Sequence, residues 1–162
     1  MYDTENMRRV WSRVTAGEHP AEAAETACPR DRDTILREYI DGENASASFY
    51  DRLAARMSCR TCAAMFRSMA RDERRHGRYL QTEYFLSAGD TFAPKKENTG
   101  RMTVSKALRE SYLAEIKTAE NYEREATLPS WTEKQRAVFR EMARDERRHA
   151  ENLRTLIKKM MA

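Results

Sequence analysis

One stretch of this sequence occurs twice. Residues 70–76 and residues 143–149 both read ARDERRH. The residues just before each copy are also similar, MFRSM at 65–69 and VFREM at 138–142. A repeated unit of this kind predicts two related halves that bury their apolar faces against each other. The repeat therefore restricts the fold more than any other feature of the chain.

Each copy of the repeat is preceded by a second shared pattern. Glu43 comes two helical turns before Tyr50, and Glu115 comes two helical turns before Tyr122. Side chains at this spacing lie on one face of a helix. Each half is therefore predicted to be a pair of helices, with one inward Glu on the first and an inward Glu-x-x-His on the second.

The composition favours helices along most of the chain. Gly (5) and Pro (4) are scarce in 162 residues, and charged residues make up 35%. Such sequences form long helices more readily than sheets. We expect four main helices, at about 33–57, 59–87, 103–127 and 131–160.

Residues typical of helix ends support these limits. Ser58 is expected to cap the second helix, and Leu128-Pro129 to end the third, because proline disfavours helix in the residue before it. Ser130 and Glu133 have the spacing of a capping box for the fourth helix.

The lengths of the connections predict the topology. Two short loops give a first hairpin at 33–87 and a second at 103–160, and residues 88–102 are long enough to cross the length of the bundle. Two hairpins with one long crossover are the ferritin-like arrangement. The predicted class is thus all-α, a ferritin-like antiparallel four-helix bundle over 33–162. Residues 1–32 are expected to form an extra short N-terminal helix and a polar linker.

Acidic residues lie on the predicted inner faces of all four helices. A buried carboxylate is costly unless a charge compensates it, and the arginines of the repeat fall mostly on outer faces. Two divalent cations would balance four carboxylates, and two neutral imidazoles would add ligands without charge. Because Glu-x-x-His places both side chains on one face, two matched copies are far more specific than one. The candidate metal ligands and catalytic residues are Glu43, Glu73, His76, Glu115, Glu146 and His149.

Carboxylate and imidazole ligands suit iron or manganese, and zinc remains an alternative. Asp72 and Asp145 precede the Glu of each repeat. We expect each of them to accept a hydrogen bond from the free ring N–H of a ligand histidine in the other half. The alternative is an ordinary surface Asp. Tyr50 and Tyr122 are expected to hydrogen bond to ligand carboxylates, or else to be core tyrosines.

The remaining composition excludes several classes of protein. Three cysteines, Cys28, Cys59 and Cys62, are an odd number and argue against a disulfide scaffold. Cys59-x-x-Cys62 supplies only half of the ligands of a four-thiolate site, so it is either a redox pair or part of a helix start.

The net charge of the chain is +4, and its basic residues are spread among acidic ones, which argues against binding to nucleic acid. No apolar stretch could span a membrane or serve as a signal core, so we expect a cytoplasmic protein.

The chain resembles the rubrerythrin group of the ferritin-like superfamily over about residues 33–160. The resemblance implies a di-iron centre, with two iron ions, that reduces hydrogen peroxide to water with electrons from a rubredoxin centre. The residues that carry it are Glu43 with Tyr50, DERRH at 72–76, Glu115 with Tyr122, and DERRH at 145–149.

Two features depart from that group. Thr118 stands where rubrerythrins often carry an extra carboxylate ligand, so the site looks like the six-ligand type of bacterioferritins. The ligand set therefore puts in doubt the iron movement typical of rubrerythrins. The four cysteines of a rubredoxin domain are also absent. Electrons are therefore expected from a separate, rubredoxin-like donor protein.

These features leave three hypotheses for the function. The first is a di-iron peroxidase that acts against oxidative stress. The second is a ferroxidase or iron-handling protein that uses O₂ and assembles into a cage. The third is a metal-binding scaffold without turnover, and a di-iron hydroxylase with an apolar channel for a larger substrate also stays open. A homodimer is expected, because proteins of the resembled group commonly pair.

Overall fold

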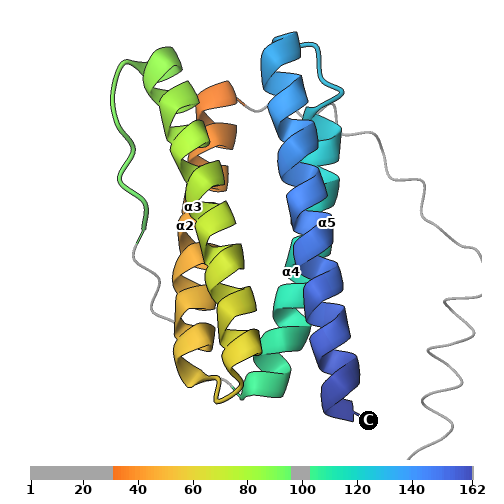
Figure 1. The fold of residues 1–162 in the computed structure, drawn as a ribbon. Helices are drawn as coiled ribbons and strands as arrows, with labels where there is room; N and C mark the ends of the chain where they lie inside the picture. The colour runs from red at the N-terminus through yellow and green to blue at the C-terminus, as the bar shows by residue number, and fades with distance from the viewer. Residues whose placement is uncertain (1–30, 96–102, 162) are drawn as a thin grey trace, which may run out of the picture. The chain divides into compact units, whose positions relative to one another are not determined.

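The computed structural model describes residues 31–95 and 103–161, and this part of the chain contains four α-helices and no strand (Figure 1). The expected all-α class is confirmed. Most of the expected N-terminal helix and linker, and residues 96–102 of the expected crossover, lie outside the described residues. The helices are α2 (Arg32–Arg56), α3 (Arg60–Ala88), α4 (Val104–Glu125) and α5 (Glu133–Met161).

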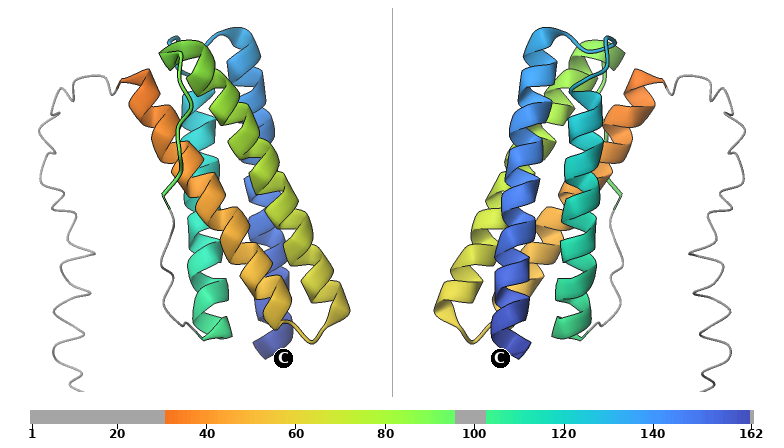
Figure 2. Two further views of the ribbon diagram at one scale, coloured as in Figure 1. Left: turned by 90° about the vertical axis from the view of Figure 1, so that its left-hand side faces the viewer. Right: turned by 90° about the vertical axis from the view of Figure 1, so that its right-hand side faces the viewer.

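The helices form two antiparallel hairpins. Helix α2 pairs with α3, and α4 pairs with α5 (Figures 1 and 2). Helix α3 ends and α4 begins at opposite ends of the bundle, so the connection between them joins the two ends. Its first residues run back along the first hairpin, where the backbone N–H of Lys95 donates to Asp41 (2.8 Å). The ferritin-like topology is thus confirmed.

The start of α3 differs from the expected one. Cys59, and not Ser58, is the N-cap, with extended backbone angles and a sulfur that accepts a hydrogen bond from the backbone N–H of Cys62 (3.3 Å). Helix α2 ends at Arg56 and α3 begins at Arg60, so the turn between them takes two more residues than the sequence pattern suggests. The other end of α3 closes on Gly89, whose φ of 74° is in the left-handed region that glycine adopts without strain.

The start of α5 also differs. The capping box is formed by Thr132 and Gln135 rather than by Ser130 and Glu133. The backbone N–H of Gln135 donates to Thr132 Oγ1 (3.3 Å), and the backbone N–H of Thr132 donates to Gln135 Oε1 (2.9 Å). The helix begins later because Trp131 turns into the core and is buried there.

The core has two apolar clusters with a polar layer between them. One cluster is centred on Leu36, Leu80, Tyr122 and Phe139, and the other on Leu53, Phe66, Leu108 and Leu153. On each helix, the inward Glu lies between the residues that belong to one cluster and the residues that belong to the other. The polar layer is therefore enclosed at both ends by apolar packing. None of the described helices is long and apolar enough to cross a membrane.

Candidate metal centre

Six acidic and imidazole side chains meet in the polar layer of the core. Each of the six exposes 4% or less of its surface. Helices α2 and α4 contribute one Glu each, while α3 and α5 contribute the Glu and the His of each repeat. They are Glu43, Glu73, His76, Glu115, Glu146 and His149, the complete set expected to bind metal.

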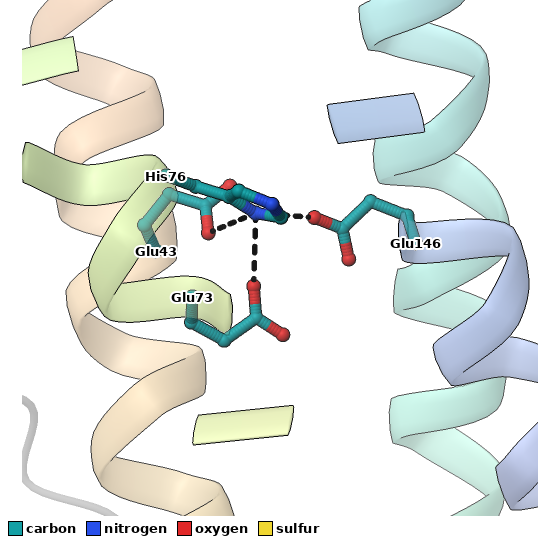
Figure 3. Close-up of side chains that lie close together, drawn as sticks. All are labelled: Glu43, Glu73, His76 and Glu146. Atoms are coloured by element: carbon teal, nitrogen blue, oxygen red, sulfur yellow. Dashed lines mark ion pairs between the residues drawn. The ribbon is translucent and has the colours of Figure 1, made fainter. Parts of the chain in front are cut away.

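The first group of side chains surrounds Nδ1 of His76. This nitrogen lies 3.0 Å from Glu146 Oε1, 3.4 Å from Glu43 Oε2 and 3.5 Å from Glu73 Oε2. Figure 3 shows that Glu146 reaches the group from α5, opposite the helices that carry the other three residues. The two hairpins therefore share this site.

The second group repeats this arrangement around His149. Its Nδ1 lies 3.1 Å from Glu73 Oε1, 3.2 Å from Glu146 Oε2 and 3.8 Å from Glu115 Oε2. Glu73 and Glu146 thus belong to both groups, one oxygen in each. Two adjacent four-residue sites with two common carboxylates have the donor set of a di-metal centre with bridging ligands.

Several buried atoms of this cluster lack hydrogen-bond partners within the described part of the chain. They are Glu43 Oε2, Glu73 Oε1, His76 Nδ1 and Glu146 Oε1. Buried polar atoms are nearly always satisfied, so four such atoms within the two groups require an explanation. Carboxylate oxygens and an imidazole nitrogen are common ligands of divalent transition metals, and a cation would satisfy them. The residues present therefore fit a pair of metal ions.

The metal-free cluster binds protons tightly. Burial lowers the pKa of His149, but its contacts with Glu115, Glu146 and Glu73 outweigh burial and raise this pKa to about 12. Similar contacts raise the pKa of His76 still further. Burial and the neighbouring Glu146 raise the pKa of Glu115 to about 8. Metal ions must displace these protons, so metal binding is coupled to proton release.

Asp72 and Asp145 orient the two histidines across the approximate twofold axis. His76 Nε2 lies 3.2 Å from Asp145 Oδ2, and His149 Nε2 lies 3.3 Å from Asp72 Oδ2. Each Asp comes from the half opposite to its histidine. A carboxylate at Nε2 keeps the proton on that nitrogen and leaves Nδ1 free to face the cluster.

Two arginines of the repeats join the two aspartates, although their helical phase placed them on outer faces. Arg75 bonds to Asp72 (2.9 Å) and to Asp145, and Arg148 bonds to Asp72 (3.0 Å) and to Asp145. Burial raises the pKa of Asp72, but the contacts with His149 and with these arginines outweigh it and lower this pKa. Helical phase alone does not predict this closed ring, because long arginine side chains can reach a neighbouring helix from an outer position.

The tyrosines also act across the hairpins. Tyr50 donates its hydroxyl to Glu115, and Tyr122 donates to Glu43. Burial raises the pKa of both phenols well above the usual value, so both stay protonated donors. Each tyrosine thus fixes the carboxylate that belongs to only one of the two groups.

A small cavity reaches the cluster between α2 and α4. Its volume is about 240 Å³, and all four inward carboxylates contribute to its wall. Gly42, Ser46 and Thr118 form other parts of the wall. A small molecule in this cavity would lie directly beside the four inward carboxylates.

Glu125 is a further buried carboxylate, which the inward pattern of the repeats does not predict. It accepts hydrogen bonds from the Tyr39 hydroxyl (3.0 Å) and from the Trp131 indole N–H (2.9 Å). Counted from the matched residues Glu43 and Glu115, the equivalent position in the first half is Leu53. A glutamate where the other half carries leucine is the sequence signal that could have revealed it.

The comparisons with known proteins agree with this geometry. A family model described as Rubrerythrin matches residues 34–128, more than half of the 162-residue chain. The match includes α2, α3 and α4, and the related repeat on α5 lies beyond it. No curated protein and no solved structure matches the chain significantly.

Proposed function

This chain belongs to the rubrerythrin family, and from that premise we propose that it is a non-haem di-iron oxidoreductase that reduces hydrogen peroxide to water. The observation that supports the proposal best is the pair of histidine-centred groups that share Glu73 and Glu146 beside a cavity. The overall reaction consumes one hydrogen peroxide, two electrons and two protons, and releases two waters.

In this proposal each group of four residues holds one iron ion. Glu43 and His76 would hold one ion and Glu115 and His149 the other, while Glu73 and Glu146 belong to both groups. With two Fe²⁺ ions bound, the centre would have the two electrons that cleavage of the O–O bond requires. Four carboxylates balance the charge of two Fe²⁺ ions, which suits a deeply buried site.

The protein side chains would position the ions and limit access to them. Asp72 and Asp145 hold the imidazoles so that Nδ1 faces the cluster. Tyr50 and Tyr122 fix the terminal carboxylates by hydrogen bonds, and the apolar clusters on either side exclude bulk water. Preorganised ligands of this kind keep the geometry while the charge of the ions changes.

The size of the cavity supports a small substrate. Sites for organic ligands usually have volumes of ~300–1000 Å³. The cavity at the carboxylates measures about 240 Å³, and the four Glu occupy much of its wall. Hydrogen peroxide or O₂ fits such a space, whereas a hydroxylase for a larger apolar substrate would need a larger and more apolar one.

The source of electrons is a separate protein in this proposal, since the chain has only three cysteines and a rubredoxin centre needs four. We propose a small one-electron carrier of the rubredoxin class. It would deliver two electrons in succession to the oxidised centre. The homodimer expected from the resemblance also remains a proposal.

Stopped-flow absorbance tests the reaction. Protein loaded anaerobically with Fe²⁺ is mixed with hydrogen peroxide in one series and with O₂ in another. Fast oxidation by peroxide and slow oxidation by O₂, at two irons per chain, is the expected result. The double variant Glu73→Gln, Glu146→Gln should lose both iron ions. The matched control, Glu151→Gln, changes an exposed Glu on α5 and should behave like the parent.

Other outcomes would identify the alternatives. Faster oxidation by O₂ than by peroxide would favour a ferroxidase, above all if size-exclusion chromatography showed a large cage. Stable binding of two ions that neither oxidant affects would favour the scaffold hypothesis. Either result would refute peroxide reduction by this centre.

A further inference from the structure

A pair of cysteines lies at the turn between α2 and α3, apart from the metal centre. Cys59 is the N-cap of α3, and its carbonyl accepts the first helical hydrogen bond, from the backbone N–H of Ala63 (2.9 Å). The backbone N–H of Cys62 donates to the Cys59 sulfur at 3.3 Å. This bond places the two thiols side by side, one helical turn apart.

The two thiols have different surroundings. Cys59 is exposed at the end of the bundle, whereas Cys62 is partly buried under the first turn. The pKa of Cys59 is lowered because the Cys62 thiol and backbone N–H both donate to its sulfur. The same contact with Cys59, together with burial, raises the pKa of Cys62. The exposed thiol is therefore the better nucleophile and the covered thiol the proton donor.

Within the part of the chain that the structure describes, no further ligand completes a metal site around the pair. The described residues contain two groups of His, Cys, Asp and Glu that could hold a metal ion, and neither group includes Cys59 or Cys62. A structural zinc site needs four ligands, and this pair supplies two. The geometry therefore favours chemistry between the two sulfurs themselves.

We propose that Cys59 and Cys62 are a redox-active pair that peroxides oxidise to a disulfide, independently of the metal centre. The Cys59 thiolate attacks one oxygen of hydrogen peroxide, the O–O bond breaks, and a sulfenic acid and hydroxide form. The Cys62 sulfur then attacks the Cys59 sulfur and expels the sulfenic oxygen as water. The thiol protons neutralise the hydroxide and the leaving oxygen. In total, two thiols and one peroxide give one disulfide and two waters.

The local structure permits this closure. Residues one turn apart in a helix have Cβ atoms ~5–6 Å apart, and a disulfide needs ~3.5–4.5 Å. Cys59 lies outside the helix proper, with φ of −69° and ψ of 110°, so its side chain can move toward Cys62 without breaking the helix. The disulfide would remove the sulfur acceptor from the Cys62 N–H. Exposure of Cys59 also leaves the disulfide open to a thiol reductant, which attacks a disulfide sulfur by exchange.

The full chain with zinc in the metal centre tests the proposal, because zinc undergoes no redox change and cannot reduce peroxide. A Cys28→Ser background removes the one cysteine outside the described residues. Treatment with hydrogen peroxide should abolish alkylation of both remaining thiols, lower the intact mass by two hydrogens, and be reversed by dithiothreitol. Iodoacetamide should modify Cys59 at least about tenfold faster than Cys62 at pH 7.

Two single variants separate the roles of the thiols. Cys62→Ser should form a sulfenic acid at Cys59 that dimedone traps. Cys59→Ser should leave Cys62 reduced, and it keeps the fold because serine is a good N-cap. The proposal fails if both thiols stay alkylatable after peroxide, if Cys59→Ser oxidises as fast as the parent, or if the pair binds a further zinc ion. Failure of peroxide reduction by the iron-loaded centre would leave these results unchanged, so the two proposals are tested separately.

Discussion

Replacement of Asp72 by alanine tests whether the aspartates of the repeats support metal binding. The Asp72 carboxylate accepts a hydrogen bond from His149 Nε2 (3.3 Å), and the Asp72 side chain is 16% exposed. Loss of such a partner typically lowers metal affinity about 10- to 100-fold, which corresponds to about 1.4–2.7 kcal/mol. We expect this loss at one of the two ions, because Asp145 still supports His76.

The same loss of metal-binding free energy predicts the change in thermal stability. A ligand stabilises the folded state in proportion to the logarithm of its affinity, so saturating metal should stabilise Asp72→Ala by about 1.4–2.7 kcal/mol less than the parent. For a domain of this size, the metal-induced rise in Tm should shrink by roughly 3–10 °C. The comparison uses the rise on adding metal, because Asp72→Ala also removes bonds to Arg75 and Arg148 that affect the metal-free protein.

Competition titrations with a chromophoric chelator measure the affinity, and circular dichroism at increasing temperature measures the rise in Tm. Asp51→Ala is the matched control, since it removes a carboxylate that is 51% exposed and pairs with Arg74 at 2.8 Å. An exposed pair of this kind contributes about 0–1 kcal/mol and has no connection to the cluster. Asp72 does not support metal binding if Asp72→Ala binds both ions within twofold of the parent, or if Asp51→Ala weakens binding equally.

Two further predictions concern the other buried carboxylates. Glu125→Leu removes the acceptor of the buried Trp131 indole N–H and one acceptor of the partly buried Tyr39 hydroxyl, and a buried donor that loses its partner costs ~1–3 kcal/mol. Urea unfolding should show a loss of about 1–3 kcal/mol for Glu125→Leu and a smaller one for Glu125→Gln, and equal losses would contradict this assignment. A 100-fold excess of metal over Kd should stabilise the parent by ~2.7 kcal/mol per site, and Glu73→Gln with Glu146→Gln should abolish this gain while the helical spectrum is kept. A metal-induced gain that survives in the double variant would show that the ions bind elsewhere.

The identity of the helix faces could be read from the sequence because helical periodicity is a local property. Glu73 and His76 share a face at any position of α3, and the repeat transfers the same conclusion to Glu146 and His149. With Gly and Pro scarce, the chain had few alternatives to four helices. The predicted fold class and the family resemblance are confirmed, and the six inward side chains meet in one layer. Their role as metal ligands stays a prediction.

The helix starts were less predictable, because capping depends on where a neighbouring side chain is buried. Ser130 has the right spacing for a cap, yet Trp131 enters the core and delays α5. Burial of a large indole outweighs the preference of one capping residue, since a cap contributes only ~0.5–2 kcal/mol. The spacing of residues in the sequence does not show that burial of Trp131 competes with capping by Ser130.

Periodicity and loop lengths in the sequence were enough to predict the four helices, their pairing into hairpins and the inward position of every Glu and His of the cluster. Which side chains of different helices meet could be seen only once the helices were packed. Tyr50 binds Glu115 rather than the Glu43 of its own helix, and the arginines close a ring over both histidines from the outer faces. The physical reason is that periodicity fixes the direction of a side chain on its own helix. The partner it reaches depends on how two helices cross, and that is set by the packing of the whole core.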